Sequence, residues 1–389
     1  MRHYGVGKMK ILFFLTARYP THKAYGVTTG ETARELRELG NVTKVIAPGN
    51  RYSKSEYDVY ENEVLPLYTP FSNFVRRFFS NISIVGPVTF IVTSIVITLR
   101  AIKVIRHEKP DVLWLRDYWA TLLLARIFPK SKLVLEIHQS PSFAKSIILA
   151  NLEKKDRVAF ITIQESLKRE LIKRYPRAKS FMGPMGASKA FFDVGRSKLS
   201  TFSQKQEDSL RVCYLGRMQS SGKDNGILQL LEDWRSIPIS VASLTLIGFS
   251  NIEFDQIVKL NSLINVNLIA SIDHLDVPKV LAEFDCGLVP YPEGNYHRTR
   301  FPIKIVEYCG SGLNIVANNT LSNREILSED FAYFYTAGDS SSLLKILKEI
   351  RELQSDSKKR AERGFMWAQN YTYSNRIREI YPFLEGYIN

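Results

Sequence analysis

The chain has 389 residues, about twice a typical single-domain length, so we expect two domains with separate cores. Hydrophobic residues make up 45% of the chain and charged residues 24%, which excludes a disordered or low-complexity protein. The net charge is +14, and the three cysteines (Cys213, Cys286 and Cys309) form no CxxC pair, which excludes a disulfide framework and gives no support to a metal site.

The first domain opens with the apolar run Lys10–Leu15, which suits a strand buried on both faces of a parallel sheet. We expect a loop containing Gly26 and Gly30 next, followed by a helix over Glu31–Leu39. Val42–Ala47 is then predicted as a strand. These elements make one β-α-β unit.

The segment Phe74–Arg106 stands out because residues 78–99 carry no charge. Ile82–Leu99 is long enough to cross a bilayer, but a Gly-Pro pair interrupts it, and the strand that follows must return to the same sheet. We therefore expect no spanning. For Phe90–Ile105 two interpretations remain open: a buried helix that covers the sheet, or part of a surface element.

The stretch Phe74–Pro87 favours the surface. Arg76 and Arg77 stand beside Phe78 and Phe79, and aromatic groups can enter the headgroup boundary while cations pair with anionic lipid. We interpret this stretch as a membrane-docking element.

The β-α alternation then continues to the end of the first domain. Strands are predicted over Asp111–Leu115, Lys132–Ile137 and Val158–Ile163, and helices over Tyr118–Ile127 and Glu165–Tyr175. Strands separated by helix-length segments predict a doubly wound parallel sheet rather than a sandwich. The Gly-rich start and polar end of Phe181–Ser209 mark it as the boundary between domains.

The second half repeats the same rhythm. Strands are predicted over Val212–Leu215, Ser243–Ile247, Val266–Ile269, Cys286–Val289 and Asn314–Ala317, and helices over Gly226–Trp234, Pro278–Phe284, Lys304–Cys309 and, in pattern, Ser341–Tyr387. The fold class is therefore α/β, with two Rossmann-like doubly wound domains.

Positive charge is concentrated in the first half. Residues 1–190 carry 31 Lys and Arg against 15 Asp and Glu, and the remainder carries 22 against 24. This asymmetry predicts a large anionic partner of the first half, either a membrane surface or a polyanionic acceptor. Nucleic acid is the competing partner, but we expect none, because no helix-turn-helix, zinc-finger or RNP signature accompanies the charge.

Two loops of the second half carry the candidate chemistry. Gly216–Lys223 holds Arg217 and Lys223 around a Gly/Ser loop, expected to be flexible and to open a helix, which suits a diphosphate clamp. A cationic surface loop is the alternative. In Phe301–Gly312, Glu307 lies on a short helix, where a carboxylate can accept hydrogen bonds from the two hydroxyls of a ribose; the alternative is a helix carboxylate paired with Lys304.

These motifs, in this order, resemble the retaining glycosyltransferases of the GT-B fold, family 4 type. Gly216-Arg217 with Lys223 resembles the family's diphosphate loop, and Pro302–Gly312 resembles its P-x-K-x-x-E-Y stretch. Phe284–Pro290 and Leu246–Gly248 are similar to two further strand motifs. The resemblance implies domains 1–190 on the acceptor side and 191–365 on the nucleotide-sugar side, facing a cleft, and a terminal helix 366–389 that crosses back.

The resemblance also implies roles for individual residues. Arg217 and Lys223 would be the donor phosphate cations, and Gly216 and Lys304 would belong to the same donor site. Ile305 and Val306 would supply backbone N–H groups to the phosphates, and Glu307 would bind the ribose. His138 would contact the donor sugar; without the family, a loop histidine bonded to a carbonyl is the simpler interpretation. Gly26 is a candidate for an acceptor-side loop.

One position departs from the family. A second Glu often stands eight residues before the ribose Glu, and here that residue is Thr299, flanked by Arg298 and Arg300. The usual contact to the donor sugar is in doubt at Thr299, and the arginines suggest an anionic donor or acceptor.

The resemblance implies transfer of a sugar from a UDP- or GDP-sugar to a glycan or lipid-linked acceptor, with retention, for cell-surface polysaccharide or glycolipid synthesis. We expect no metal, because no Asp-x-Asp motif occurs, and no other cofactor. Two alternatives stay open: a non-catalytic GT-B binding subunit, and a nucleotide-sugar epimerase. An epimerase needs converging acid-base residues, and we expect His138 to lack a nearby carboxylate.

Few cysteines and no secretory signal peptide predict a cytoplasmic protein, peripheral on the inner face of the membrane.

Overall fold

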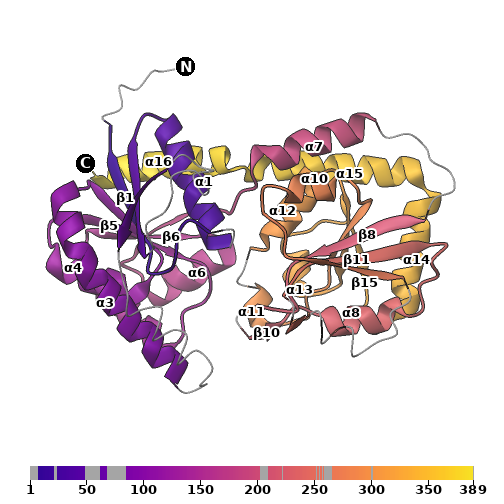
Figure 1. Cartoon of the computed structure of the whole chain (residues 1–389), viewed down its shortest axis with the longest axis horizontal. Coiled ribbons are helices and arrows are strands. Elements are labelled where there is room, and N and C mark those ends of the chain that lie inside the picture. The colour runs from indigo at the N-terminus through magenta and orange to yellow at the C-terminus, as the bar shows by residue number, and fades with distance from the viewer. Residues whose placement is uncertain are drawn as a thin grey trace. The chain divides into compact units, whose positions relative to one another are not determined.

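The computed structural model describes residues 8–388 except 22–23, 49–61, 68–84, 202–208, 221, 251, 254, 256, 258–264 and 299–300. The chain forms two compact units: Met1–Pro184 with Arg376–Asn389, and Met185–Asn375. Each unit is built on a parallel sheet flanked by helices, which confirms the predicted fold class (Figure 1). The division at Pro184 lies inside the segment predicted as the boundary, and the chain returns to the first unit at Arg376.

The first unit contains a seven-stranded sheet. Its strands are β1 (Lys10–Phe14), β2 (Val42–Pro48), β3 (Glu63–Leu67), β4 (Val112–Leu115), β5 (Lys132–Ile137), β6 (Val158–Thr162) and β7 (Lys179–Met182). They lie in the order β3-β2-β1-β4-β5-β6-β7, and all neighbouring pairs are parallel. The order reverses between β1 and β4, and doubly wound sheets bind ligands at the carboxyl ends beside such a point.

Helices cover both faces of this sheet. They are α1 (Ala24–Glu38), α3 (Val85–Glu108), α4 (Tyr118–Ile127), α5 (Phe143–Leu152), α6 (Glu165–Arg174) and α16 (Tyr373–Ile388). On one face, α1 and α16 pack against β1 and β4, and the buried residues Phe13, Trp114 and Ile380 lie in this core. The other face is covered by α3 and α4 (Figure 1).

The predicted loop around Gly26 and Gly30 is wrong, because both glycines lie inside α1, which begins at Ala24 rather than at Glu31. A Cβ at position 26 would lie 2.5 Å from the carbonyl oxygen of Thr21, so close packing explains a glycine there. Gly26 instead allows the first turn of a helix to lie close to Thr21.

The second unit contains a six-stranded sheet. Its strands are β8 (Leu210–Leu215), β11 (Ala242–Phe249), β12 (Val266–Ala270), β13 (Cys286–Val289), β14 (Asn314–Asn318) and β15 (Ala332–Tyr335). Their order is β12-β11-β8-β13-β14-β15, and all pairs are parallel. The order reverses between β8 and β13, so ligand chemistry is expected where these strands end.

The helices of this unit form two layers around the sheet. They are α7 (Lys189–Ser200), α8 (Ile227–Trp234), α10 (Val277–Leu281), α11 (Asn295–Arg298), α12 (Ile303–Gly310), α13 (Leu321–Arg324), α14 (Ser340–Glu352) and α15 (Gln354–Ala368), which a 3₁₀ turn, η1 (Gln369–Tyr371), follows. One core cluster contains α7, α10, α12 and α15, and the other contains α8 and α14 (Figure 1).

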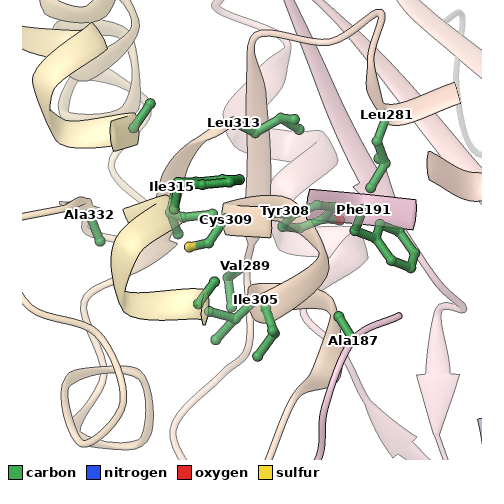
Figure 2. Packing of buried hydrophobic residues seen from close by; sticks show 14 of the residues in the cluster. Ala187, Phe191, Leu281, Val289, Ile305, Tyr308, Cys309, Leu313, Ile315 and Ala332 are labelled. Carbon is green, nitrogen blue, oxygen red and sulfur yellow. The ribbon is translucent and has the colours of Figure 1, made fainter. Parts of the chain in front are cut away.

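Helix α12 is anchored in the first of these clusters. Figure 2 shows Ile305, Tyr308 and Cys309 among side chains of β13, β14 and α7, and all three are fully buried. Gly287 of β13 makes room for the Tyr308 ring, because a Cβ there would lie 2.4 Å from it. The core therefore fixes the helix that carries the motif resembling the family's P-x-K-x-x-E-Y stretch.

Candidate functional site

The strands β8 and β13 separate at the switch point. They pair only through Cys286 with Val212 and Gly287 with Cys213. Beyond that, the backbone N–H of Leu215 donates to the Tyr308 hydroxyl at 2.6 Å instead of to a neighbouring strand. The chain can then leave the sheet at Gly216, whose φ of +139° favours glycine.

The loop after β8 contains a short hairpin. β9 (Gln219–Ser220) and β10 (Lys223–Asp224) pair in antiparallel fashion. The hydroxyl of Tyr214 and the amide of Asn225 both donate to the Arg217 carbonyl, at 2.9 and 2.8 Å. α8 follows the hairpin and begins at Ile227, one residue after the predicted helix start at Gly226.

The two predicted phosphate cations are both accessible. The side chain of Arg217 is 57% exposed, with its Nε 3.9 Å from Oε2 of Glu253. Burial raises the pKa of Glu253, but hydrogen bonds from Ser250, the Arg217 charge and the Met218 N–H outweigh it and lower that pKa. Lys223 is exposed on β10. Both cations can therefore meet an anion from solvent.

Lys304 lies at the base of the same loop. Its Nζ is 4.0 Å from the centroid of the Tyr214 ring and 5.2 Å from that of Tyr291, and a Cβ at Gly216 would lie 2.7 Å from it. The rings hold the ammonium by cation–π contacts. Lys304 also occupies the first turn of α12, where the helix dipole already favours negative charge. Both features favour an anion beside Gly216.

Glu307 is buried and paired with a histidine. It is 3% exposed, and its Oε1 lies 3.0 Å from Nε2 of His274, which follows β12. The edge of the Phe191 ring packs against His274, with centroids 5.7 Å apart. The carboxylate thus sits one helical turn beyond Lys304, with its orientation set by His274.

The backbone N–H groups of Ile305 and Val306 are the predicted phosphate donors, and one of them already has an acceptor in the helix. Ile305 N–H donates to the Pro302 carbonyl at 3.0 Å, so a phosphate would share this donor. Val306 lies in the next position of the helix and is buried. Thr299 lies outside the described residues.

Helix α11 holds the hairpin in place. The Tyr296 hydroxyl donates to the Ser220 carbonyl at 2.7 Å, and Nε2 of His297 lies 2.9 Å from the Asp224 carbonyl. His297 is buried and stacks on Tyr291 with centroids 4.9 Å apart. Tyr291, which also faces Lys304, therefore links the hairpin to the ammonium.

His138 belongs to the first unit and follows β5. Its Nε2 lies 3.0 Å from Oε1 of Glu136, and the Arg116 guanidinium contacts both ring nitrogens, at 3.0 Å from Nδ1. Burial and the Arg116 charge lower the pKa of His138 to about 4, so the ring is neutral at pH 7.

The expectation that His138 lacks a carboxylate partner is wrong. Glu136, two residues earlier, is 3% exposed and accepts a hydrogen bond from Trp114 Nε1 at 2.9 Å and one from Arg376 at 2.8 Å. Burial raises the pKa of Glu136, but Arg376, Arg116 and His138 outweigh it and hold that pKa well below its usual range. Glu136 is therefore an ionised carboxylate inside the unit.

Arg376 anchors the terminal helix to this group. Its side chain is fully buried and donates to Glu136, to the Thr32 hydroxyl at 2.7 Å and to the Gly183 carbonyl at 3.4 Å. Sequence reasoning missed Arg376, Glu136 and His274. A signal was present only for Glu136, a single charge between Leu135 and Ile137 in an apolar strand.

Comparison with known proteins gives two sequence matches. Residues 209–352 match the family model described as "Glycosyl transferases group 1". Glycosyltransferase TuaH of Bacillus subtilis (strain 168), whose name assigns it to teichuronic acid biosynthesis, is 27% identical over 89 residues. The matched stretch covers 23% of this chain and 21% of TuaH.

Solved structures match over nearly the whole chain. A glycosyltransferase from Rickettsia africae ESF-5 has a TM-score of 0.70 at 15% identity and covers 99% of this chain and 100% of its own. HepE of Anabaena, solved with UDP and glucose, scores 0.69 at 17% identity, over 97% and 99%. Sucrose-phosphate synthase from Thermosynechococcus elongatus scores 0.71 at 13% identity, over 97% and 100%. At these identities the likeness shows the fold, which is GT-B.

Proposed function

We propose that the protein transfers a sugar from a nucleoside diphosphate sugar to an acceptor hydroxyl with retention of anomeric configuration. The match of residues 209–352 to the group 1 glycosyltransferase model and the GT-B fold support this proposal. The acceptor attacks the anomeric carbon on the face that the diphosphate leaves. The sugar–oxygen bond to the diphosphate breaks as the new glycosidic bond forms, and the acceptor proton goes to the departing phosphate oxygen.

The observation that carries this proposal is the arrangement at the ends of β8 and β13. The Lys304 ammonium meets the Gly216 backbone, and one turn along the same helix Glu307 is held by His274. A cation beside a glycine suits a phosphate, and a buried, oriented carboxylate suits the two hydroxyls of a ribose. Lys304 and Glu307 lie one turn apart on α12, and this spacing fits the phosphate and the ribose of one nucleotide.

The protein's own cations stabilise the leaving group in this mechanism. Charge develops on the diphosphate as the bond breaks, and Arg217, Lys223 and Lys304 neutralise it. The N–H groups of Ile305 and Val306 at the positive end of α12 add to this stabilisation. We propose that no metal ion or other cofactor is needed, so chelation of divalent ions leaves the rate unchanged.

The donor carries UDP or GDP. HepE has been solved with UDP, and in another structure with UDP-glucose, so UDP-sugars are the first donors to test. The name of TuaH favours a cell-surface polysaccharide, and the acceptor is a glycan or a lipid-linked glycan.

We place His138 beside the donor sugar, as a neutral ring that accepts or donates hydrogen bonds to sugar hydroxyls, and Gly26 of α1 on the acceptor side. The Glu136 pair reopens the epimerase alternative, but a histidine with a pKa of about 4 is a poor general acid at pH 7. Glu136 is already held by Arg376 and Trp114. The pair fits positioning of the ring better than proton transfer.

The test combines binding, turnover and product analysis on the full chain. A thermal-shift screen against UDP-, GDP- and ADP-sugars identifies the donor, and donor hydrolysis or transfer is then followed with and without EDTA. Proton NMR of the anomeric signal in the first product shows whether configuration is retained. Donor binding without turnover on any acceptor would identify a binding subunit, and an epimerised donor would identify an epimerase.

A further inference from the structure

Helix α3 of the first unit has a buried face and an exposed aliphatic face. On one face, five residues are buried and pack toward α4 and the sheet: Ser94, Ile97, Thr98, Ala101 and Ile105. On the other, five aliphatic residues are 37–59% exposed: Val88, Val92, Ile95, Val96 and Leu99. Their spacing of four, seven, eight and eleven residues from Val88 places them in one stripe along the helix. We call these five residues the aliphatic stripe.

The aliphatic stripe is unusual for a helix that covers a sheet. An 18-residue window within Val88–Glu108 has a mean hydropathy of 2.0, yet only 28% of that window is buried. By length and composition, α3 is the one helix among the described residues that could cross a membrane. A contiguous exposed apolar strip of this length marks an interaction surface.

Positive charge borders the stripe at its carboxyl end. Arg100, Lys103 and Arg106 are exposed in the two turns after Leu99. On the neighbouring helix, Arg126 is exposed in the last turn of α4. An apolar strip that runs into a cationic band complements a surface with an apolar interior and anionic headgroups.

We propose that the exposed face of α3 docks on an anionic lipid surface, with the helix lying in the plane of the interface. The aliphatic stripe enters the boundary between headgroups and acyl chains, and the cations after Leu99 pair with lipid phosphates. Docking goes beyond glycosyl transfer and does not depend on it; it would bring the first unit to a lipid-linked acceptor.

Spanning is disfavoured by the other face of α3. Crossing a bilayer would remove Ile97, Ala101 and Ile105 from the core, and β4, which starts at Val112, lies in the middle of the sheet. The earlier prediction placed docking at Phe74–Pro87; Arg76, Arg77, Phe78 and Phe79 lie outside the described residues. The exposed face of α3 is a second candidate surface, and it consists of described residues.

The test is co-sedimentation of the full chain with vesicles of phosphatidylcholine, alone or with about 30% phosphatidylglycerol. We expect binding to the anionic vesicles at low salt that is at least about tenfold stronger than to neutral ones and falls with added salt. The variant Val92→Ser with Val96→Ser and Leu99→Ser should weaken it roughly tenfold or more, because it removes the apolar contact.

A matched control replaces exposed aliphatic residues of the second unit, Ile239→Ser, Ile252→Ser and Leu321→Ser, which are 63–73% exposed. This variant should bind like the wild type. Unchanged melting temperatures for both variants would show that the fold is intact.

Three results would overturn the proposal. In the first, the α3 variant binds vesicles as the wild type does. In the second, the wild type ignores anionic vesicles, and sedimentation velocity shows a dimer that the α3 variant loses, so that a second copy covers the face. In the third, bound protein resists alkaline carbonate extraction, as a spanning helix would. Donor hydrolysis in solution, measured in parallel, reports on glycosyl transfer separately.

Discussion

Arg376 offers the sharpest test of how the terminal helix is tied to the first unit. Its guanidinium has no exposed surface and pairs with Glu136, whose side chain is 4% exposed. In Arg376→Met, Glu136 would keep its hydrogen bonds from Trp114 and His138 and the nearby Arg116 charge, but it would lose the guanidinium that is hydrogen-bonded to it. Removing one member of a buried ion pair costs about 3–5 kcal/mol, because the remaining charge is desolvated and unpaired.

We therefore expect Arg376→Met to lower the free energy of unfolding of the first unit by about 3–5 kcal/mol. For a domain of this size, about 2–4 °C is lost per kcal/mol, so the melting temperature of that unit should fall by roughly 10 °C. Calorimetry gives the transition, and hydrogen exchange on peptides from β5 and α16 assigns it to the unit that contains Glu136.

The double variant Glu136→Gln with Arg376→Met separates this explanation from simple loss of packing. It removes both charges, so its cost should be well below the sum of the two single costs. A loss under about 1 kcal/mol for Arg376→Met, or additive costs in the double variant, would refute the description of a buried ion pair.

Three further predictions concern the candidate site. Arg217→Ala or Lys223→Ala should lower kcat about a hundredfold, or roughly 2.7 kcal/mol, with an unchanged fold; normal kinetics in both would place the hairpin outside the active site. Glu307→Gln should weaken nucleotide binding in calorimetry by about 1–3 kcal/mol, since a charge-assisted hydrogen bond becomes a neutral one; equal affinities would mean that Glu307 is structural. The pKa of His138 is about 4 in the folded chain and about 6.5 in the unfolded chain. Between these pH values the unfolded state binds more protons, so the free energy of unfolding should fall as the pH drops from 6.5 to 4. Urea unfolding of His138→Gln, with a flatter pH profile, checks this, and an unchanged profile would contradict it.

Much of the fold could be predicted from the sequence. Lys132–Ile137 and Cys286–Val289 were predicted with the bounds that the structure has, and Tyr118–Ile127 likewise as a helix. Strands buried on both faces are nearly continuous apolar runs. A helix start shows in a capping residue such as Asp117, whose side chain accepts from the Ala120 N–H. These signals are local, so a single sequence carries them.

Where local signals pointed two ways, packing decided. The glycines at 26 and 30 predicted a loop, but both lie inside α1, and a Cβ at Gly26 would lie 2.5 Å from the Thr21 carbonyl oxygen. The loop that holds Lys223 became a hairpin because Tyr296 and His297 hold its carbonyls. Tyr296 and His297 lie 76 and 73 residues from the carbonyls that they contact, so no local sequence pattern predicts these contacts.

The sequence alone determined the α/β class, the two repeated β-α series and the motifs that resemble a donor site. Only the tertiary structure decided which groups touch: Glu136 with Arg376, 240 residues away, His274 with Glu307, and Lys304 between two tyrosine rings. The physical reason is that periodicity reports the burial of a side chain but not its partner. In a parallel sheet, strand order sets which distant segments end side by side, and those ends hold the chemistry.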